Sequence, residues 1–490
     1  MSAAMAAAAD LSLTRRIAGY SSSRIVRQLL GAATALLRPK LLAPEHFGLW
    51  TLLRLIPNYA AYLHFGSRTA MRYLIPYHSG GEDAALVRRM QETVFTGSLT
   101  ATGGVACGLV VWAALPDGET ALRFGLIAMA AIILLQFFGE FAISNLKADG
   151  EFQILSRLNL FVAIGSFASS LPLLLFFGFY GLLVGLVLTN LLAILFLSGR
   201  RRICFPLRAD WRLFVDLVRQ GMPPMLSELF ITLVGTADRF VIGFYLGKES
   251  LGHYGVGIML FSLLVNVPGA AREVLEPMAM REIRSAPAGR IVGRYLIEPL
   301  ARTVLLTPPL VVAGFFFLPL VFEFFLPRYL PGLAAARTLL LGVYFLSLSY
   351  PARTLITAYD LQRRFIFWLL PVLLSNPVLS ALLVRSRLGL AGAASASVLA
   401  FACIPLVQFL LLRSRLEKAM ARLLLVSLLL TPAVLLLLTL VPTSLLALEG
   451  PAACVVLALA GGLLAGAVQA GLVSWLRAID TGGEAGGCHG

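Results

Sequence analysis

Apolar runs follow one another along almost the whole chain and are separated by short polar connections. About 20 mostly apolar residues cross a bilayer as a helix, which satisfies its own backbone hydrogen bonds in hydrocarbon. None of the polar connections is long enough to fold as a domain. We therefore expect an all-α polytopic membrane protein with about 14 transmembrane helices. The expected spans are residues 17–37, 47–65, 94–115, 121–146, 158–177, 179–197, 221–246, 254–271, 299–325, 334–358, 365–384, 388–412, 423–441 and 452–476.

The charged residues predict how these helices are oriented. The chain has 40 Lys and Arg against 25 Asp and Glu, a net charge of +15. With the N-terminus in the cytoplasm, 30 basic residues lie on the cytoplasmic side and nine on the opposite side, while Arg239 lies within a span. Cytoplasmic loops are enriched in Lys and Arg, so this bias supports the helix count and places both termini in the cytoplasm. The positive charge encodes topology, and we expect no nucleic-acid partner.

Two sequence echoes indicate an internal repeat. At an offset of 204 residues, the end of the first span matches the end of the seventh; at 211, the start of the sixth matches the start of the twelfth. The matched pairs are Leu42 and Leu246, Glu45 and Glu249, Gly48 and Gly252, Gly178 and Gly389, and Gly181 and Gly392. Transporters are commonly built from such repeats, with substrate held between the halves. We expect a cytoplasmic N-terminus (1–16), six-helix halves (17–198 and 221–412) joined by a basic cytoplasmic linker (199–220), two added C-terminal helices (413–476) and a disordered cytoplasmic tail (477–490).

Three short stretches resemble a known family. Residues 41–50 (LLAPEHFGLW) are similar to the turn after the first helix of O-antigen and polysaccharide flippases, where a leucine precedes Gly-Pro-Glu and Phe-Gly. Residues 237–254 (ADRFVIGFYLGKESLGHY) resemble the seventh-helix signature of these flippases, and residues 147–153 (KADGEFQ) resemble the polar turn after their fourth helix. The family belongs to the superfamily of multidrug, oligosaccharidyl-lipid and polysaccharide exporters. One departure is Ala43, where the family more often has glycine.

The resemblance implies a flippase of the bacterial inner membrane for surface polysaccharide biosynthesis. Its expected substrate is a lipid-linked oligosaccharide on an undecaprenyl pyrophosphate carrier, moved from the cytoplasmic to the periplasmic leaflet by alternating access. A polysaccharide polymerase and chain-length machinery are the further partners considered. A headgroup rich in hydroxyls cannot cross about 30 Å of hydrocarbon unaided, so the protein needs a polar cavity.

Basic residues within the expected spans are candidates for binding the pyrophosphate. Ionisable groups in spans are costly and mark function, and arginine binds phosphate oxygens with two donors at once. The candidate substrate-binding residues are Arg24, Arg27, Arg54 and Arg239. Other interpretations remain open: Arg24 and Arg27 could anchor in the headgroups, and Arg239 could form a structural ion pair with its neighbour Asp238.

Carboxylates within the spans are candidates for coupling transport to an H⁺ or Na⁺ gradient, and we expect no other cofactor and no metal. Glu228 is the first choice, because eleven residues are close to three helical turns and should place it on one face with Arg239, beside the Pro223–Pro224 break. Asp238 and Glu140 are the next candidates, although Glu140 could simply be buried in its neutral form.

The sequence does not suggest an enzyme. Its five histidines are scattered, and a polysaccharide polymerase or ligase would need a large periplasmic loop, which the expected topology does not contain. A multidrug antiporter of the same superfamily is the main rival, but it would need acidic residues in the first two spans, which carry Arg24, Arg27 and Arg54 and no Asp or Glu. Two more functions stay open, a flippase for a lipid-linked peptidoglycan precursor and a structural membrane protein.

Overall fold

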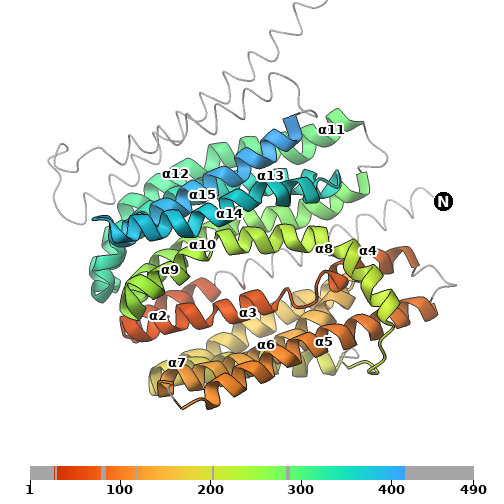
Figure 1. Cartoon of the computed structure of the whole chain (residues 1–490), viewed down its shortest axis with the longest axis horizontal. Helices are drawn as coiled ribbons and strands as arrows, with labels where there is room; N and C mark the ends of the chain where they lie inside the picture. Colours follow the sequence, from red (N-terminus) through yellow and green to blue (C-terminus); the bar gives the residue numbers. More distant parts are fainter. Residues whose placement is uncertain are drawn as a thin grey trace, which may run out of the picture. The chain divides into compact units, whose positions relative to one another are not determined.

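A computed structural model describes residues 27, 30–78, 84–116, 118–200, 204–282 and 287–413, and these residues form helices and no strands (Figure 1). The chain divides into two compact units, Met1–Leu229 and Phe230–Gly490. The expected spans 423–441 and 452–476 and the two expected cytoplasmic ends, 1–16 and 477–490, lie outside the described residues. The boundaries expected for the six-helix halves stay a prediction.

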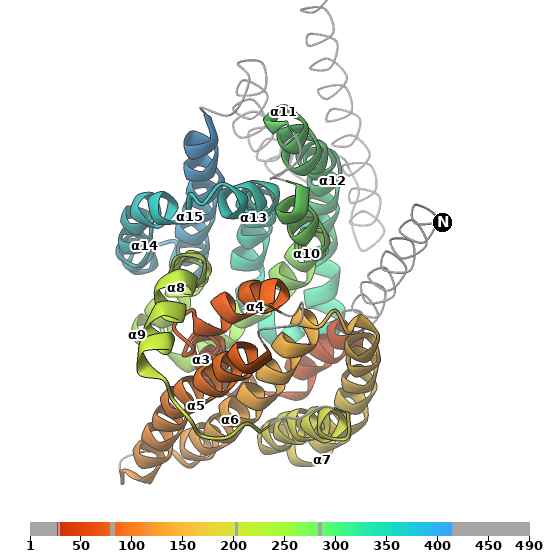
Figure 2. The same cartoon turned by 90° about the vertical axis from the view of Figure 1, so that its right-hand side faces the viewer.

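The first unit is organised around one central helix. After helical residues 30–41, its elements are α2 (Pro44–Leu53), α3 (Leu55–Ala60), α4 (Ser67–His78), α5 (Ala84–Ala114), α6 (Thr120–Ala148), α7 (Phe152–Ser198) and most of α8 (Trp211–Val234). Residues 230–234 at the end of α8 belong to the second unit. Helix α6 contacts α2, α3, α4, α5 and α7, and α5 runs beside it in both Figures 1 and 2. The side chains of α6 therefore face most of the other helices of this unit.

Helix α4 occupies a stretch that we expected to be a polar connection. Its residues Ala70, Met71 and Ile75 are buried in a core cluster with side chains of α5, α6 and α8. These apolar positions recur at helical spacing, so one face of the segment is buried against the core. The opposite face carries the exposed Arg72, and the half-buried Arg68 lies in the first turn.

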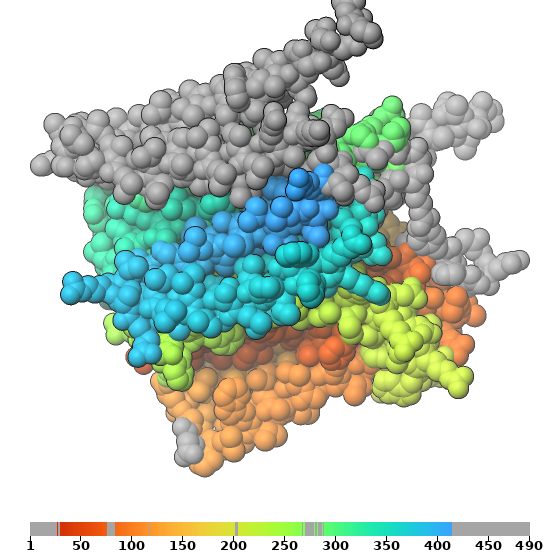
Figure 3. Space-filling view, turned by 45° about the horizontal axis from the view of Figure 1, so that its top comes forward, coloured from red at the N-terminus to blue at the C-terminus, as the bar shows by residue number. Residues whose placement is uncertain are grey.

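The second unit contains the remaining described elements. They are α9 (Ala237–Tyr245), α10 (Gly247–Glu282), α11 (Ala288–Val292), the π-helix η1 (Gly293–Ile297), α12 (Glu298–Leu320), the π-helix η2 (Val321–Phe325), the 3₁₀-helix η3 (Pro327–Gly332), α13 (Leu333–Ala358), α14 (Gln362–Arg385) and α15 (Gly389–Leu412). Helix α13 packs against α10, α12 and α15. Helices α14 and α15 lie side by side, as the cyan and blue surface in Figure 3 shows.

Seven described segments are long and apolar enough to cross a membrane. They are Ala84–Ala114, Thr120–Ala148, Phe152–Ser198, Gly289–Phe325, Pro327–Ala358, Gln362–Arg385 and Gly389–Leu412. They coincide with the third to sixth and the ninth to twelfth expected spans, because Phe152–Ser198 holds two of these. The expected second span is divided between α2 and α3, and the seventh between α8 and α9.

The matched glycines of the two halves are explained by the backbone conformation at their positions. Gly178 interrupts α7 with φ 56° and ψ −129°, and a Cβ on Gly181 would lie 1.8 Å from the carbonyl oxygen of Leu173. In the second unit Gly389 has φ 51°, and a Cβ on Gly392 would lie 2.5 Å from the carbonyl oxygen of Leu383. At each reversal one glycine adopts a conformation disfavoured for other residues, and a second lets two backbones approach closely.

A third correspondence between the two units is visible only in the backbone conformation. Gly150, with φ 73°, ends α6, and the N–H of the next residue donates to the Leu146 carbonyl at 2.9 Å. Asp360, with φ 53°, follows α13, and the N–H of the next residue donates to the Ile356 carbonyl at 2.9 Å. Both are Schellman-type helix ends, and the two positive-φ residues are 210 positions apart. The expected fold class, an all-α membrane protein with repeated halves, is confirmed.

Candidate functional site

A polar cavity lies within the first unit. It holds about 380 Å³ of empty space, counting the part that is open to the surroundings. The end of α3, the turn after it and helices α4, α5 and α6 form its wall. The polar and charged side chains of the wall are His64, Arg68, Ser98, Thr102, Gln136 and Glu140.

A tight turn brings His64 to this cavity. Phe65 has φ 48° and Gly66 has φ 88°, and a Cβ on Gly66 would lie 2.4 Å from the backbone carbon of Gly221 on α8. The Gly66 N–H donates to Nδ1 of the buried His64 imidazole at 2.9 Å. Because Nδ1 accepts this hydrogen bond, the neutral ring carries its proton on Nε2 and can donate from there.

Arg68 and Glu140 place opposite charges on the wall. The Nη2 group of Arg68 donates to the Ala61 carbonyl at 3.3 Å. Arg68 also interacts electrostatically with the Glu140 carboxylate of α6, but no ion pair joins the two in the described part of the chain. The side chain of Glu140 is exposed, so the expectation that it is buried is wrong.

Helix α5 adds hydroxyl groups to the same wall. Ser98 is 2% exposed, and its Oγ has no hydrogen-bond partner among the described residues. Thr102 follows one turn later and is also buried. A buried hydroxyl without a partner costs free energy unless water or a ligand satisfies it. The cavity therefore combines a guanidinium, an imidazole N–H, hydroxyls, an amide and one carboxylate, a set suited to an anion that carries hydroxyl groups.

The other predicted basic residues of the first unit lie elsewhere. Arg24 is outside the described residues. The exposed Arg27 donates from Nη1 to Oδ1 of the buried Asn159 on α7 at 2.9 Å. Arg54 is half-buried between α2 and α3 and does not line the cavity described above. Their assignment to substrate binding stays a prediction.

Asp238 and Arg239 are buried in the second unit. Asp238 is 2% exposed, and its Oδ2 accepts hydrogen bonds from the Tyr254 hydroxyl and, at 2.9 Å, from Ser397 Oγ. Its Oδ1 accepts the Arg239 backbone N–H at 2.8 Å. Within the described residues the Arg239 side chain forms no ion pair with Asp238, and its Nε has no hydrogen-bond partner. The hydroxyl contacts of Asp238 replace the structural ion pair considered from the sequence.

Glu228 and Arg239 do not share one helix. Helix α8 continues through Pro223 and Pro224 and ends at Val234, and α9 begins at Ala237. The argument that three regular turns place Glu228 and Arg239 on one face is therefore wrong, as is the expected break at the prolines. The freed carbonyl of Val234 accepts a hydrogen bond from Asn376 Nδ2 of α14 at 2.8 Å. Glu228 itself is half-buried on α8.

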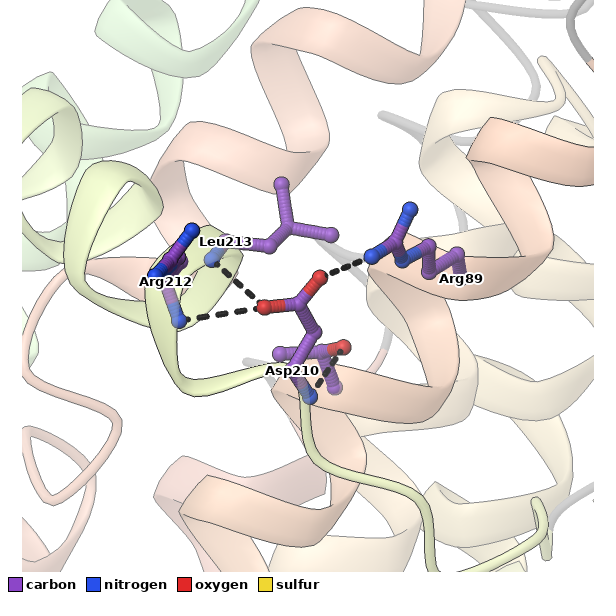
Figure 4. A network of polar contacts seen from close by, with 5 residues as sticks. Arg89, Asp210, Arg212 and Leu213 are labelled. Atoms are coloured by element: carbon purple, nitrogen blue, oxygen red, sulfur yellow. Dashed lines mark hydrogen bonds and ion pairs between the residues drawn. The ribbon is translucent and has the colours of Figure 1, made fainter.

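The connection before α8 is held on the first unit by Asp210 (Figure 4). Its Oδ1 accepts the backbone N–H groups of Arg212 and Leu213 at 3.1 and 3.2 Å, which caps α8, and its Oδ2 pairs with Arg89 of α5. Its own N–H donates to Thr93 Oγ1 at 3.3 Å. The Leu213 hydrogen bond, reinforced by the Arg89 charge, holds the pKa of the Asp210 carboxyl below its usual value.

Sequence reasoning found one residue of the cavity, Glu140, and missed His64, Arg68 and Ser98. The available signal was local: Arg68 and Arg72 are four residues apart, next to a face of apolar residues at helical spacing. Such a pattern indicates an amphipathic helix that packs on a core. The segment lies between the expected spans 47–65 and 94–115, and it is too short and too polar to cross a membrane.

Comparisons with known proteins agree with this architecture. A family model described as "Polysaccharide biosynthesis protein" matches residues 40–326, more than half of the chain. The lipid II flippase MurJ, in an inward closed conformation, superposes with a TM-score of 0.68 at 14% identity, covering 94% of this chain and 99% of that one. An inward-facing multidrug resistance MATE family transporter of the MOP superfamily gives 0.63 at 14% identity, covering 81% and 98%. No curated protein matches. At this identity the structures show the fold alone, whereas the family model shows that the chain belongs to the polysaccharide biosynthesis protein family.

Proposed function

We propose that this protein is a flippase that moves an undecaprenyl-pyrophosphate-linked oligosaccharide from the cytoplasmic to the periplasmic leaflet of the bacterial inner membrane. Membership of the polysaccharide biosynthesis family and a transporter fold support a lipid-linked flippase or exporter. The observation that carries the proposal is the cavity of the first unit, whose wall combines Arg68 with hydroxyl and amide groups. These groups can replace the water around a charged sugar headgroup that must cross hydrocarbon.

Arg68 is the residue we assign to the phosphate. A guanidinium keeps its charge in a membrane protein and presents several donors in one plane, which matches phosphate oxygens. The Ala61 carbonyl uses one of these donors and orients the group, while the remaining donors are available to a ligand. Arg24, Arg27, Arg54 and Arg239 keep their proposed roles as further contacts along the path of the headgroup.

A multidrug antiporter of the same superfamily is the second candidate, and one observation favours it. Glu140 places a carboxylate in the cavity of the N-terminal unit, where an exporter of organic cations needs one. The same wall carries Arg68 and the N–H of His64, which repel or fail to bind a cation. The balance of donors supports the anionic substrate.

We also propose that Asp238 comes before Glu228 as the site where an H⁺ or Na⁺ gradient drives alternating access. The reasons for preferring Glu228 were a shared face with Arg239 and a proline break, and the structure provides neither. Asp238 is buried, and its contacts with Tyr254 and Ser397 join α9, α10 and α15. Neutralising or binding a cation at this carboxylate would change those contacts, which is how a local charge biases a two-state element.

The substrate assignment can be tested in proteoliposomes that contain a fluorescent lipid-linked oligosaccharide. Arg68→Ala should reduce transport about 10- to 150-fold, which corresponds to losing about 1.5–3 kcal/mol of charged hydrogen bonds. Arg68→Lys should restore part of it. Arg72→Ala is the matched control, because Arg72 is exposed one turn further along α4 and does not line the cavity. Wild-type transport by a correctly inserted Arg68→Ala protein would contradict the assignment.

The coupling assignment needs the same assay with and without an imposed ion gradient. Asp238→Asn should lower transport and remove its dependence on the gradient. Glu228→Gln should lower the rate less and keep the dependence. The opposite pattern would return the coupling role to Glu228.

A further inference from the structure

The charges of the first unit's cavity are arranged in a way that limits which anions it accepts. Arg68 and Glu140 line the same space and interact electrostatically, yet no ion pair joins them in the described part of the chain. The Arg68 guanidinium is held by the Ala61 carbonyl, and Glu140 projects from the regular helix α6. Each charge therefore faces the cavity, and a ligand can contact both.

A simple anion gains little from such a pair. Close to Arg68 it is attracted by the guanidinium, but the Glu140 carboxylate on the same wall repels it. A second negative charge on the ligand makes the repulsion larger. An anion that also carries a hydroxyl group differs, because the hydroxyl donates a charge-assisted hydrogen bond to Glu140 and turns the repulsive contact into an attractive one.

The rest of the wall supports a ligand of this kind. Ser98 lines the cavity, and its Oγ is buried without a hydrogen-bond partner in the described residues. The Nε2–H of His64 is a further donor, because Nδ1 of this ring accepts the Gly66 N–H. These groups stand on α5 and on the turn before α4, whereas Glu140 stands on α6.

We propose that Glu140 is a specificity-determining residue that selects a glycosyl phosphate whose sugar next to the phosphate is uncharged and rejects one whose sugar is acidic. Arg68 and His64 take the phosphate, and Glu140 accepts a sugar hydroxyl. The proposal rests on the proposed function, because it describes the headgroup that the flippase takes. It adds the sugar chemistry, which neither the family nor the fold specifies.

Three soluble probes test this on the purified full-length protein in nanodiscs: glucose 1-phosphate, glucuronic acid 1-phosphate and methyl phosphate. Calorimetric titration of the wild type should rank glucose 1-phosphate tightest and glucuronic acid 1-phosphate weakest. In Glu140→Gln the acidic and the simple phosphate should bind about tenfold more tightly, so that the preference largely disappears. Glu140→Asp should keep the wild-type order, and Glu45→Gln, an exposed carboxylate of α2 outside the cavity, should change nothing.

The outcomes separate this inference from the proposed function. Unchanged ratios in a folded Glu140→Gln protein overturn the selectivity of Glu140, and so does a wild type that binds none of the probes. If the protein transports the lipid-linked oligosaccharide but Glu140→Gln leaves the relative affinities for the three probes unchanged, the flippase function is supported and only the role of Glu140 is refuted. If Glu140→Gln changes the relative affinities for the probes but the protein does not transport the lipid-linked oligosaccharide, the selectivity of the cavity is supported and the flippase function is refuted.

Discussion

The two helix reversals allow a quantitative prediction that needs no ligand. In Gly181→Ala the new methyl would lie 1.8 Å from the Leu173 carbonyl oxygen, a separation that real side chains do not show. Because the obstacle is backbone, the helices on either side of Gly178 must move apart. We expect a loss of about 3 kcal/mol of folding free energy, at the upper end for overpacked positions. Gly392→Ala meets the Leu383 oxygen at 2.5 Å and should cost about 1–3 kcal/mol.

Two further glycines separate the steric cost from the conformational one. Nothing lies within 4 Å of a Cβ on Gly178 or Gly389, and both have positive φ. Alanine at these positions should therefore cost about 1–3 kcal/mol, for the backbone conformation alone. Gly103, inside α5, is the control: its surroundings are open, so Gly103→Ala should stabilise the helix by about 0.5–1 kcal/mol.

Thermal unfolding of the purified variants in one detergent gives the ranking. The expected order of melting temperatures, from lowest, is Gly181→Ala, then Gly392→Ala and the two positive-φ variants, then wild type and Gly103→Ala. The ranking matters more than absolute values, since membrane proteins seldom unfold reversibly. Equal melting temperatures for Gly181→Ala and Gly178→Ala would refute the claim that close backbone approach requires the glycine.

Three other predictions concern single contacts and topology. The pKa of the Asp210 carboxyl is lower in the folded protein than in the unfolded chain, so the ionised carboxylate stabilises the fold at neutral pH and this stabilisation is lost as the pH falls. Asp210→Asn keeps the helix cap and should flatten the decline in melting temperature below about pH 4. Asn376→Leu leaves the buried Val234 carbonyl without its donor and should cost about 1–3 kcal/mol in thermal unfolding; an unchanged melting temperature would contradict this. Reporter fusions should report cytoplasm after Arg290 and periplasm after Lys248, and a periplasmic signal after Arg290 would overturn the expected orientation.

The sequence predicted well where length and apolarity decide the structure. Eight expected spans coincide with described segments because a run of about 20 apolar residues has few alternatives to a membrane helix. The reversal at Gly178 was also predictable, since the glycine separates two such runs. Helix α4 was missed because its apolar face is short, and only its contacts with α5 and α6 make it part of the core.

The site was harder to predict because the search was confined to charges inside expected spans. Arg68 lies just beyond such a span, and the turn at Phe65 and Gly66 brings it to the cavity. The pairing of Glu228 with Arg239 failed for a related reason, because residue spacing predicts a shared face only along an uninterrupted helix. A proline pair is a stronger break signal than one glycine, yet α8 passes through the prolines and ends just before Gly235.

The two units share their backbone geometry at corresponding positions, but they differ in their buried polar side chains. Both units end a helix in a positive-φ turn, at Gly150 and at Asp360, and in both units the chain reverses direction at a glycine. These positions are restricted by backbone sterics, because a Cβ disfavours positive φ. The polar interiors differ: the first unit has an open wall around Arg68, and the second buries Asp238 among hydroxyl groups. The same helix ends and reversals therefore hold an accessible polar wall in the first unit and a buried, fully hydrogen-bonded carboxylate in the second.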